Sequence, residues 1–144
     1  MDAPWILLAD DDLEDQEMLI DMIRQVDDSL PIETVSDGHQ ALEKLSRLPE
    51  EEIPSLIVLD YKMPYLSAAE VLEALARDPR YAAVPKVVWS TSHREEDVRR
   101  CIEAGASEYF EKPATTAELR SIAGKMLEYR NMEKFRNAES HDGK

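Results

Sequence analysis

Side chains that could handle a phosphoryl group follow four of the strands predicted for this chain. They are Asp10 and Asp11 after the first strand, Asp60 at the end of the third, Ser90 and Thr91 at the end of the fourth, and Lys112 after the fifth. The carboxyl ends of parallel strands meet at one edge of a sheet, where open α/β proteins bind their ligands. We therefore expect these side chains to share one site.

The chemistry expected of such a set is transfer of a phosphoryl group with the help of a metal ion. Clustered carboxylates repel one another unless a cation neutralises them. Mg²⁺ suits such a site because it takes one or two carboxylates and keeps water and phosphate oxygens as its other ligands. A lysine and a hydroxyl can hold phosphoryl oxygens, and an aspartate can be the nucleophile that carries the phosphoryl group.

The elements that must position these residues alternate between strands and helices. Short apolar runs between turn signals predict five strands, at residues 4–10, 32–35, 56–60, 84–90 and 106–110. Apolar side chains at helical spacing predict five helices, which begin near residues 13, 39, 67, 92 and 115. Asp12 is the predicted N-cap of the first helix, and capping boxes are predicted at Ser67–Glu70 and Ser92–Glu95. In the fourth helix, Ile102 is expected to face inward with its apolar neighbours.

Strands separated by helices of this length predict a parallel sheet that is covered on both faces. The fold class is α/β, and five units fit a flavodoxin-like, doubly wound (βα)5 three-layer sandwich with a five-stranded parallel sheet. One domain is expected over residues 1–127. Residues 128–144 are expected to add a helical extension as far as Arg136 and a disordered tail from Ser140.

Composition and charge narrow the classes of partner. The chain has 144 residues, of which 43% are hydrophobic and 33% charged, as in a globular domain. A formal net charge of -14 disfavours binding to nucleic acid or to an anionic membrane. The single cysteine, Cys101, cannot form an internal disulfide. With no apolar run of membrane-spanning length and no signal-peptide pattern, a cytoplasmic location is expected.

Taken in order and spacing, these motifs resemble the receiver domain of two-component response regulators. The resemblance covers residues 5–127 and rests on Asp10-Asp11, Asp60 with Met63-Pro64, Ser90-Thr91, Gly105-Ala106, Tyr109 and Lys112-Pro113. The receivers that this chain resembles are of the stand-alone, single-domain type. The acidic loop before Asp60, the turn at residues 78–81 and the run at residues 89–92 resemble small bacterial single-domain receivers, including those that serve bacteriophytochrome kinases.

The resemblance implies a metal site and a phosphoacceptor. Asp60 would accept a phosphoryl group from a sensor histidine kinase or a histidine phosphotransfer protein. Asp11 would bind Mg²⁺ directly and Asp10 through water. Asp60 itself and the backbone carbonyl of Lys62 would complete the protein ligands.

The resemblance also implies how the site would bind phosphate and respond to it. Lys112 and Thr91 would bind the phosphoryl group, Ser90 would reorient toward it, and Tyr109 would be the aromatic switch. The peptide bond between Lys112 and Pro113 would be cis. Phosphorylation would then alter a surface around the fourth helix and fifth strand that meets a downstream protein target.

The function implied is a signalling switch in a phosphorelay rather than an enzyme, with formation of a homodimer left open. One alternative is a pseudo-receiver adapter that binds partners without phosphorylation. Lys62 supports that alternative because it departs from the small polar residues common at its position, and we expect it to tune the lifetime of the phosphorylated state. A second departure is Ala68, where receivers often have glycine, and the capping box at Ser67 offers an explanation. Taken singly, Lys112-Pro113 could be a surface turn and Tyr109 an ordinary half-buried aromatic.

Overall fold

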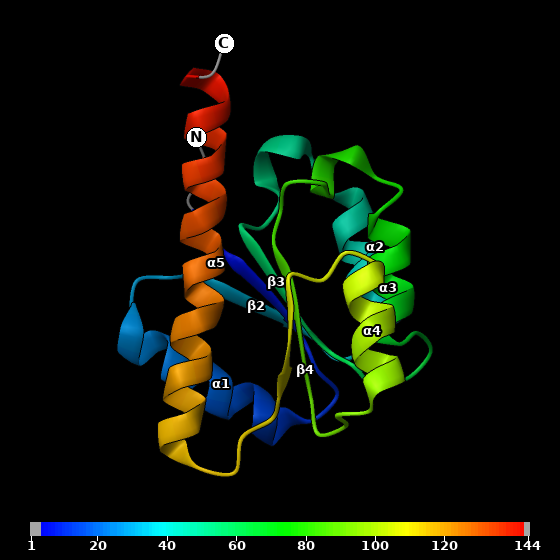
Figure 1. The fold of residues 1–144 in the computed structure, drawn as a ribbon, viewed down its shortest axis with the longest axis vertical. Coiled ribbons are helices and arrows are strands. Elements are labelled where there is room, and N and C mark those ends of the chain that lie inside the picture. The colour runs from blue at the N-terminus through cyan, green and yellow to red at the C-terminus, as the bar shows by residue number, and fades with distance from the viewer. Residues whose placement is uncertain (1–3, 143–144) are drawn as a thin grey trace.

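The computed structural model describes residues 4–142, and of residues 131–142 only the backbone. Five strands form one parallel sheet in the order β2-β1-β3-β4-β5 (Figure 1). The strands are β1 (Ile6–Ala9), β2 (Ile32–Val35), β3 (Leu56–Asp60), β4 (Lys86–Ser90) and β5 (Glu108–Glu111). The predicted flavodoxin-like, doubly wound fold is therefore confirmed.

In residues 4–142, four α-helices and two short 3-10 helices connect the strands, and a fifth α-helix follows β5. The α-helices are α1 (Leu13–Val26), α2 (Gly38–Arg47), α3 (Ala68–Leu75), α4 (Glu95–Glu103) and α5 (Thr116–Asp142), and the 3-10 helices are η1 (Glu50–Glu52) and η2 (Pro79–Tyr81). None of the described helices is both long enough and apolar enough to cross a membrane.

The core lies in two layers, one on each face of the sheet. Successive strand side chains point to opposite faces, so each strand supplies both layers. Leu59 and Val88 pack with α2, α3 and α4, whereas Val58 and Trp89 pack with α1 and α5. Figure 1 shows α1 and α5 together on one side of the sheet and α2, α3 and α4 on the other. All five residues of β3 are buried, so this central strand carries Asp60 to the middle of the sheet's edge.

Two predictions for α4 are wrong. Its N-cap is Arg94, which makes no side-chain cap hydrogen bond, so the capping box expected at Ser92–Glu95 does not form. Ser92 belongs instead to the preceding loop, where its backbone N–H donates to Ser90 Oγ at 3.0 Å. Ile102 is 44% exposed rather than inward, because α4 buries only a narrow stripe around Cys101.

The capping box at the start of α3 is confirmed. The Glu70 N–H donates to Ser67 Oγ, and the Ser67 N–H donates to the Glu70 carboxylate. Ala68 is the first residue of α3, and the non-glycine residue with positive φ in the loop before it is Tyr65, at 72°. A capped helix start therefore has no need of glycine at residue 68.

Helix α5 is longer than the sequence patterns indicated. It continues to Asp142, so residues 140–142 are helical rather than disordered, and 143–144 lie outside the described residues. After Thr116 the chain has no proline, and Gly124 is the only glycine before Gly143. The many residues of good helix propensity thus meet no strong helix breaker.

The loop between β3 and α3 rests on the first residue of α2, and this contact should make Gly38→Ala destabilising. A Cβ atom at Gly38 would lie 2.5 Å from the backbone oxygen of Leu66. We expect a loss of about 1–3 kcal/mol in the free energy of unfolding, as for other overpacked sites. Urea unfolding measures it, with Gly124→Ala as the matched control because a Cβ there meets open space. Equal effects of the two substitutions would refute the contact.

Candidate functional site

Three carboxylates meet at the carboxyl ends of the central strands. Asp10 follows β1, and Asp60 is the last residue of β3. Together with Asp11 they offer oxygen atoms that all lie within 4.8 Å of one another. Asp10 and Asp60 are 0% and 5% exposed, whereas Asp11 faces solvent. The predicted cluster is therefore present, with one carboxylate open to solvent.

The buried carboxylates carry more negative charge than their surroundings satisfy. Asp10 Oδ1 accepts the Asp12 N–H at 2.9 Å, and the partner of the buried Oδ2 is the Lys112 ammonium, 3.0 Å away. Burial, and then the charge of Asp10, raise the pKa of Asp60 to about 8. Burial likewise raises the pKa of Asp10. Three carboxylate oxygens this close together are a set of ligands that fits a hard divalent cation such as Mg²⁺.

Lys112 supplies a positive charge directly beside the cluster. Its side chain is 9% exposed, and Nζ lies 3.0 Å from Asp10 and 3.5 Å from Asp60. Nζ also lies 2.7 Å from Asp15 and 4.9 Å from the centre of the Trp89 ring. Burial alone would lower the pKa of Lys112, but the hydrogen bonds to Asp15 and Asp10 outweigh it and raise the pKa. Lys112 is therefore an ammonium ion at neutral pH.

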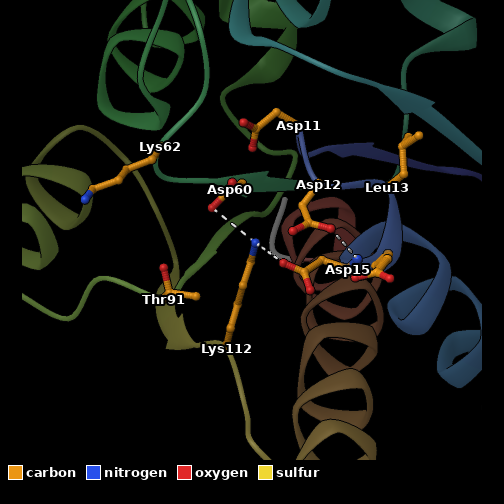
Figure 2. Close-up of a pocket in the computed structure, with 9 residues that line it drawn as sticks. Asp11, Asp12, Leu13, Asp15, Asp60, Lys62, Thr91 and Lys112 are labelled. Atoms are coloured by element: carbon orange, nitrogen blue, oxygen red, sulfur yellow. Dashed lines mark hydrogen bonds and ion pairs between the residues drawn. The ribbon is translucent and has the colours of Figure 1, made fainter.

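An open pocket of about 560 Å³ gives access to these groups, with Lys62 and Thr91 on its rim. Its size leaves room for a phosphoryl group and a hydrated ion. Thr91 is exposed at the end of β4, next to Asp60 and Lys112 in the pocket lining. Figure 2 shows the Lys62 side chain pointing away from Asp60. An influence of Lys62 on the phosphorylated state stays a prediction.

Ser90 and Tyr109 each form a hydrogen bond with the backbone of Ser92, in the loop between β4 and α4. Ser90 is 1% exposed, and its Oγ accepts the Ser92 N–H at 3.0 Å. The Tyr109 hydroxyl donates to the Ser92 carbonyl at 2.7 Å. The Tyr109 ring is buried, with its centre 6.2 Å from that of Tyr61. Movement of the Ser90 hydroxyl would therefore release the bond on the Ser92 N–H and leave the bond from Tyr109 on the Ser92 carbonyl.

The peptide bond between Lys112 and Pro113 is trans, since no peptide bond in the described residues is cis. The cis bond implied by the family resemblance is thus wrong for this structure. The physical reason is that a bond preceding proline has only a small preference between isomers, so local sequence does not fix it.

The sequence patterns missed the role of Asp15 at this site. Asp15 lies in the first turn of α1, where an acidic residue is adequately explained by the helix dipole. Its partner Lys112 is 97 residues away, so no local pattern could connect them.

Comparison with known proteins agrees with this geometry. The sequence model of the response regulator receiver domain matches residues 6–123. The two-component response regulator ORR5 of Oryza sativa subsp. japonica is 27% identical over 125 residues, which cover 87% of this chain and 90% of that protein. Among solved structures, the phosphorylated cyanobacterial phytochrome response regulator RcpA has a TM-score of 0.79 at 27% identity, covering 89% of this chain and 94% of its own.

A second solved structure bears on the metal. The Mn²⁺-bound form of response regulator Rcp1 has a TM-score of 0.74 and 27% identity, with 84% of this chain and 89% of that chain covered. The relative ORR5 is a rice protein, so a bacterial source for this chain stays a prediction.

Proposed function

This chain belongs to the response regulator receiver domain family, and on that basis we propose that Asp60 accepts a phosphoryl group in two-component signalling. The observation that carries the proposal is the meeting of three carboxylates with the Lys112 ammonium at one open pocket. Such a set combines a nucleophile, a cation site and a fixed positive charge. The phosphorylated state of RcpA supports the same chemistry here.

The proposed step is an in-line displacement at phosphorus. An Asp60 oxygen forms a bond to phosphorus while the bond from phosphorus to the donor breaks, and the donor leaves with the electron pair. Lys112 holds a phosphoryl oxygen as charge spreads over that group. Thr91 lines the pocket on the β4 side and can donate to a second oxygen.

A cation is needed because Asp60 must be ionised to attack. In the metal-free protein the pKa of Asp60 is about 8, so much of this carboxyl is protonated at neutral pH. Asp10, Asp11, Asp60 and the Lys62 backbone carbonyl would hold Mg²⁺. When bound, Mg²⁺ would neutralise the cluster and orient the phosphoryl oxygens.

The proposed switch runs through Ser92. A phosphoryl group on Asp60 would attract the Ser90 hydroxyl, which would then leave the Ser92 N–H. Because Tyr109 donates to the carbonyl of the same residue, loss of that bond would loosen Tyr109 and the start of α4. The surface around α4 and β5 would change as a result.

We propose a signalling module rather than an enzyme, with a sensor histidine kinase or histidine phosphotransfer protein as donor and a protein as downstream target. The net charge of -14 disfavours nucleic acid and anionic membranes as partners. A cytoplasmic location and formation of a homodimer are also part of the proposal.

Intact mass spectrometry can test phosphorylation directly. The protein is incubated with Mg²⁺ and acetyl phosphate, and a parallel sample contains a chelator. We expect one acid-stable, base-labile phosphoryl adduct that needs Mg²⁺ and that peptide mapping places on Asp60. An unmodified protein under the same conditions would contradict the proposal and favour the pseudo-receiver adapter.

A further inference from the structure

We infer that Asp15 is the positioning residue that keeps Lys112 at the phosphoryl site once a cation has taken the carboxylate cluster. The inference rests on the proposed function, because it concerns the lysine that would bind the phosphoryl group. Asp15 touches neither Asp60 nor the cation positions in the proposal. It would act entirely through Lys112.

The ion pairs of Lys112 single out Asp15. Among the described residues Nζ has three carboxylate partners, and Asp15 is the nearest, at 2.7 Å. An ammonium has three N–H groups, so it can donate to Asp15 and to a phosphoryl oxygen at the same time. Figure 2 shows Nζ between Asp60 on one side and Asp15 on the other. The bond to Asp15 therefore leaves donors free on the side of Asp60.

Cation binding would leave Asp15 as the remaining anchor. The other two partners, Asp10 and Asp60, both belong to the carboxylate cluster that would hold Mg²⁺. A divalent ion bound there would neutralise the charge of Asp10 and Asp60 and would repel the Lys112 ammonium. Like charges that lie a few ångströms apart repel strongly in a partly buried site. Asp15 lies outside the cluster, so its attraction for Lys112 persists.

Asp15 is itself held firmly enough to act as an anchor. It is in the first turn of α1, and its backbone N–H donates to the N-cap carboxylate of Asp12 at 3.1 Å. Its side chain is 21% exposed, and that of Lys112 only 9%, so solvent screens this pair less than an ordinary surface pair. The pair also joins α1 to the chain just after β5.

Two isosteric substitutions in the first turn of α1 provide the test. Asp15→Asn and Glu14→Gln each remove one negative charge from the lining of the same pocket, but Glu14 makes none of the ion pairs of Lys112 in the described structure. The measured quantity is the rate constant for formation of the Asp60 adduct from acetyl phosphate at saturating Mg²⁺. We expect it to fall about tenfold in Asp15→Asn. It should stay near the wild-type value in Glu14→Gln and recover in part in Asp15→Glu.

A double substitution shows whether Asp15 acts through Lys112. In a Lys112→Met background, Asp15→Asn should cause no further loss, because the two residues then form one unit. Independent effects of the two substitutions would overturn the inference, and so would an Asp15→Asn rate that equals or exceeds that of Glu14→Gln. Absence of an adduct in the wild-type protein would instead refute the proposed function, so the two failures are distinguishable.

Discussion

Asp60→Asn is expected to abolish the phosphoryl adduct and, at the same time, to stabilise the metal-free protein at pH 8. The adduct is lost because an amide oxygen is a poor nucleophile compared with a carboxylate. The protein is stabilised because a neutral, nearly isosteric amide replaces a carboxylate that burial and the Asp10 charge disfavour. Opposite effects on function and stability from one substitution are typical of a residue under functional strain.

The pH dependence follows from the raised pKa of Asp60. Its ordinary value is 3.8, and in the folded, metal-free protein it is about 8. Between these values the folded state binds a proton that the unfolded state has lost, so stability falls as pH rises through this window. The stability that the protonated Asp60 carboxyl contributes is fully present below pH 3.8 and is lost above about pH 8. By linkage the loss over this whole window is on the order of 6 kcal/mol, or roughly 12 to 24 °C in Tm.

Thermal unfolding of both proteins across pH 5 to pH 9, without divalent ions, measures this contribution as the difference between them. The difference should grow up to pH 8 and then level off, and millimolar Mg²⁺ should reduce it by stabilising the wild-type protein. Asp21→Asn, at an exposed position on α1, is the control that should show little dependence on pH. A difference that does not change with pH would show that the Asp60 carboxyl is not destabilised by its site.

The fold was predictable because its signals are local. The strands β1 and β3 are short apolar runs, and the β3 run ends at Asp60, so the sequence pattern placed that carboxylate at the sheet edge. Errors arose where several weak preferences compete. The Ser92 side chain could cap α4, but its Oγ donates to Asp97 Oδ2 at 3.2 Å and its backbone N–H donates to Ser90 Oγ, so the helix begins later. The inward orientation predicted for Ile102 was wrong for a similar reason. The core covers only part of the apolar face of α4, so Ile102 stays exposed.

The sequence predicted which residues belong to the site, but not all of the contacts between them. Strand ends converge by topology, which brought Asp10, Asp60 and Lys112 together. The ion pair of Lys112 with Asp15 depends instead on how α1 starts relative to the chain after β5, and this three-dimensional placement leaves no sequence pattern. Trp89 is buried in the core, and no sequence pattern indicated its contact with the Lys112 ammonium.

Lys112→Met should be the most destabilising substitution at the site. It removes the ammonium that pairs with Asp10 and Asp60 in the described part of the chain, and so leaves the fully buried Asp10 without its ion-pair partner. Removing one partner of a buried ion pair costs about 3–5 kcal/mol. We expect a loss of this size at pH 8 without metal, and a smaller loss at pH 5, where the two carboxyls can be protonated. Denaturant unfolding at the two pH values measures both.

Recovery by a cation or by a second substitution would identify charge imbalance as the cause of that loss. Mg²⁺ should restore most of the stability of Lys112→Met, because a cation bound to the carboxylates replaces the missing ammonium. Asp60→Asn in the same chain should also restore part of it by removing one of the unpaired charges. Lys62→Met is the matched control, since it removes a lysine from the same pocket whose side chain points away from Asp60, and it should change stability by less than about 0.5 kcal/mol. If Lys112→Met stayed equally unstable with Mg²⁺ and with Asp60→Asn, the loss would come from packing against Trp89 rather than from charge.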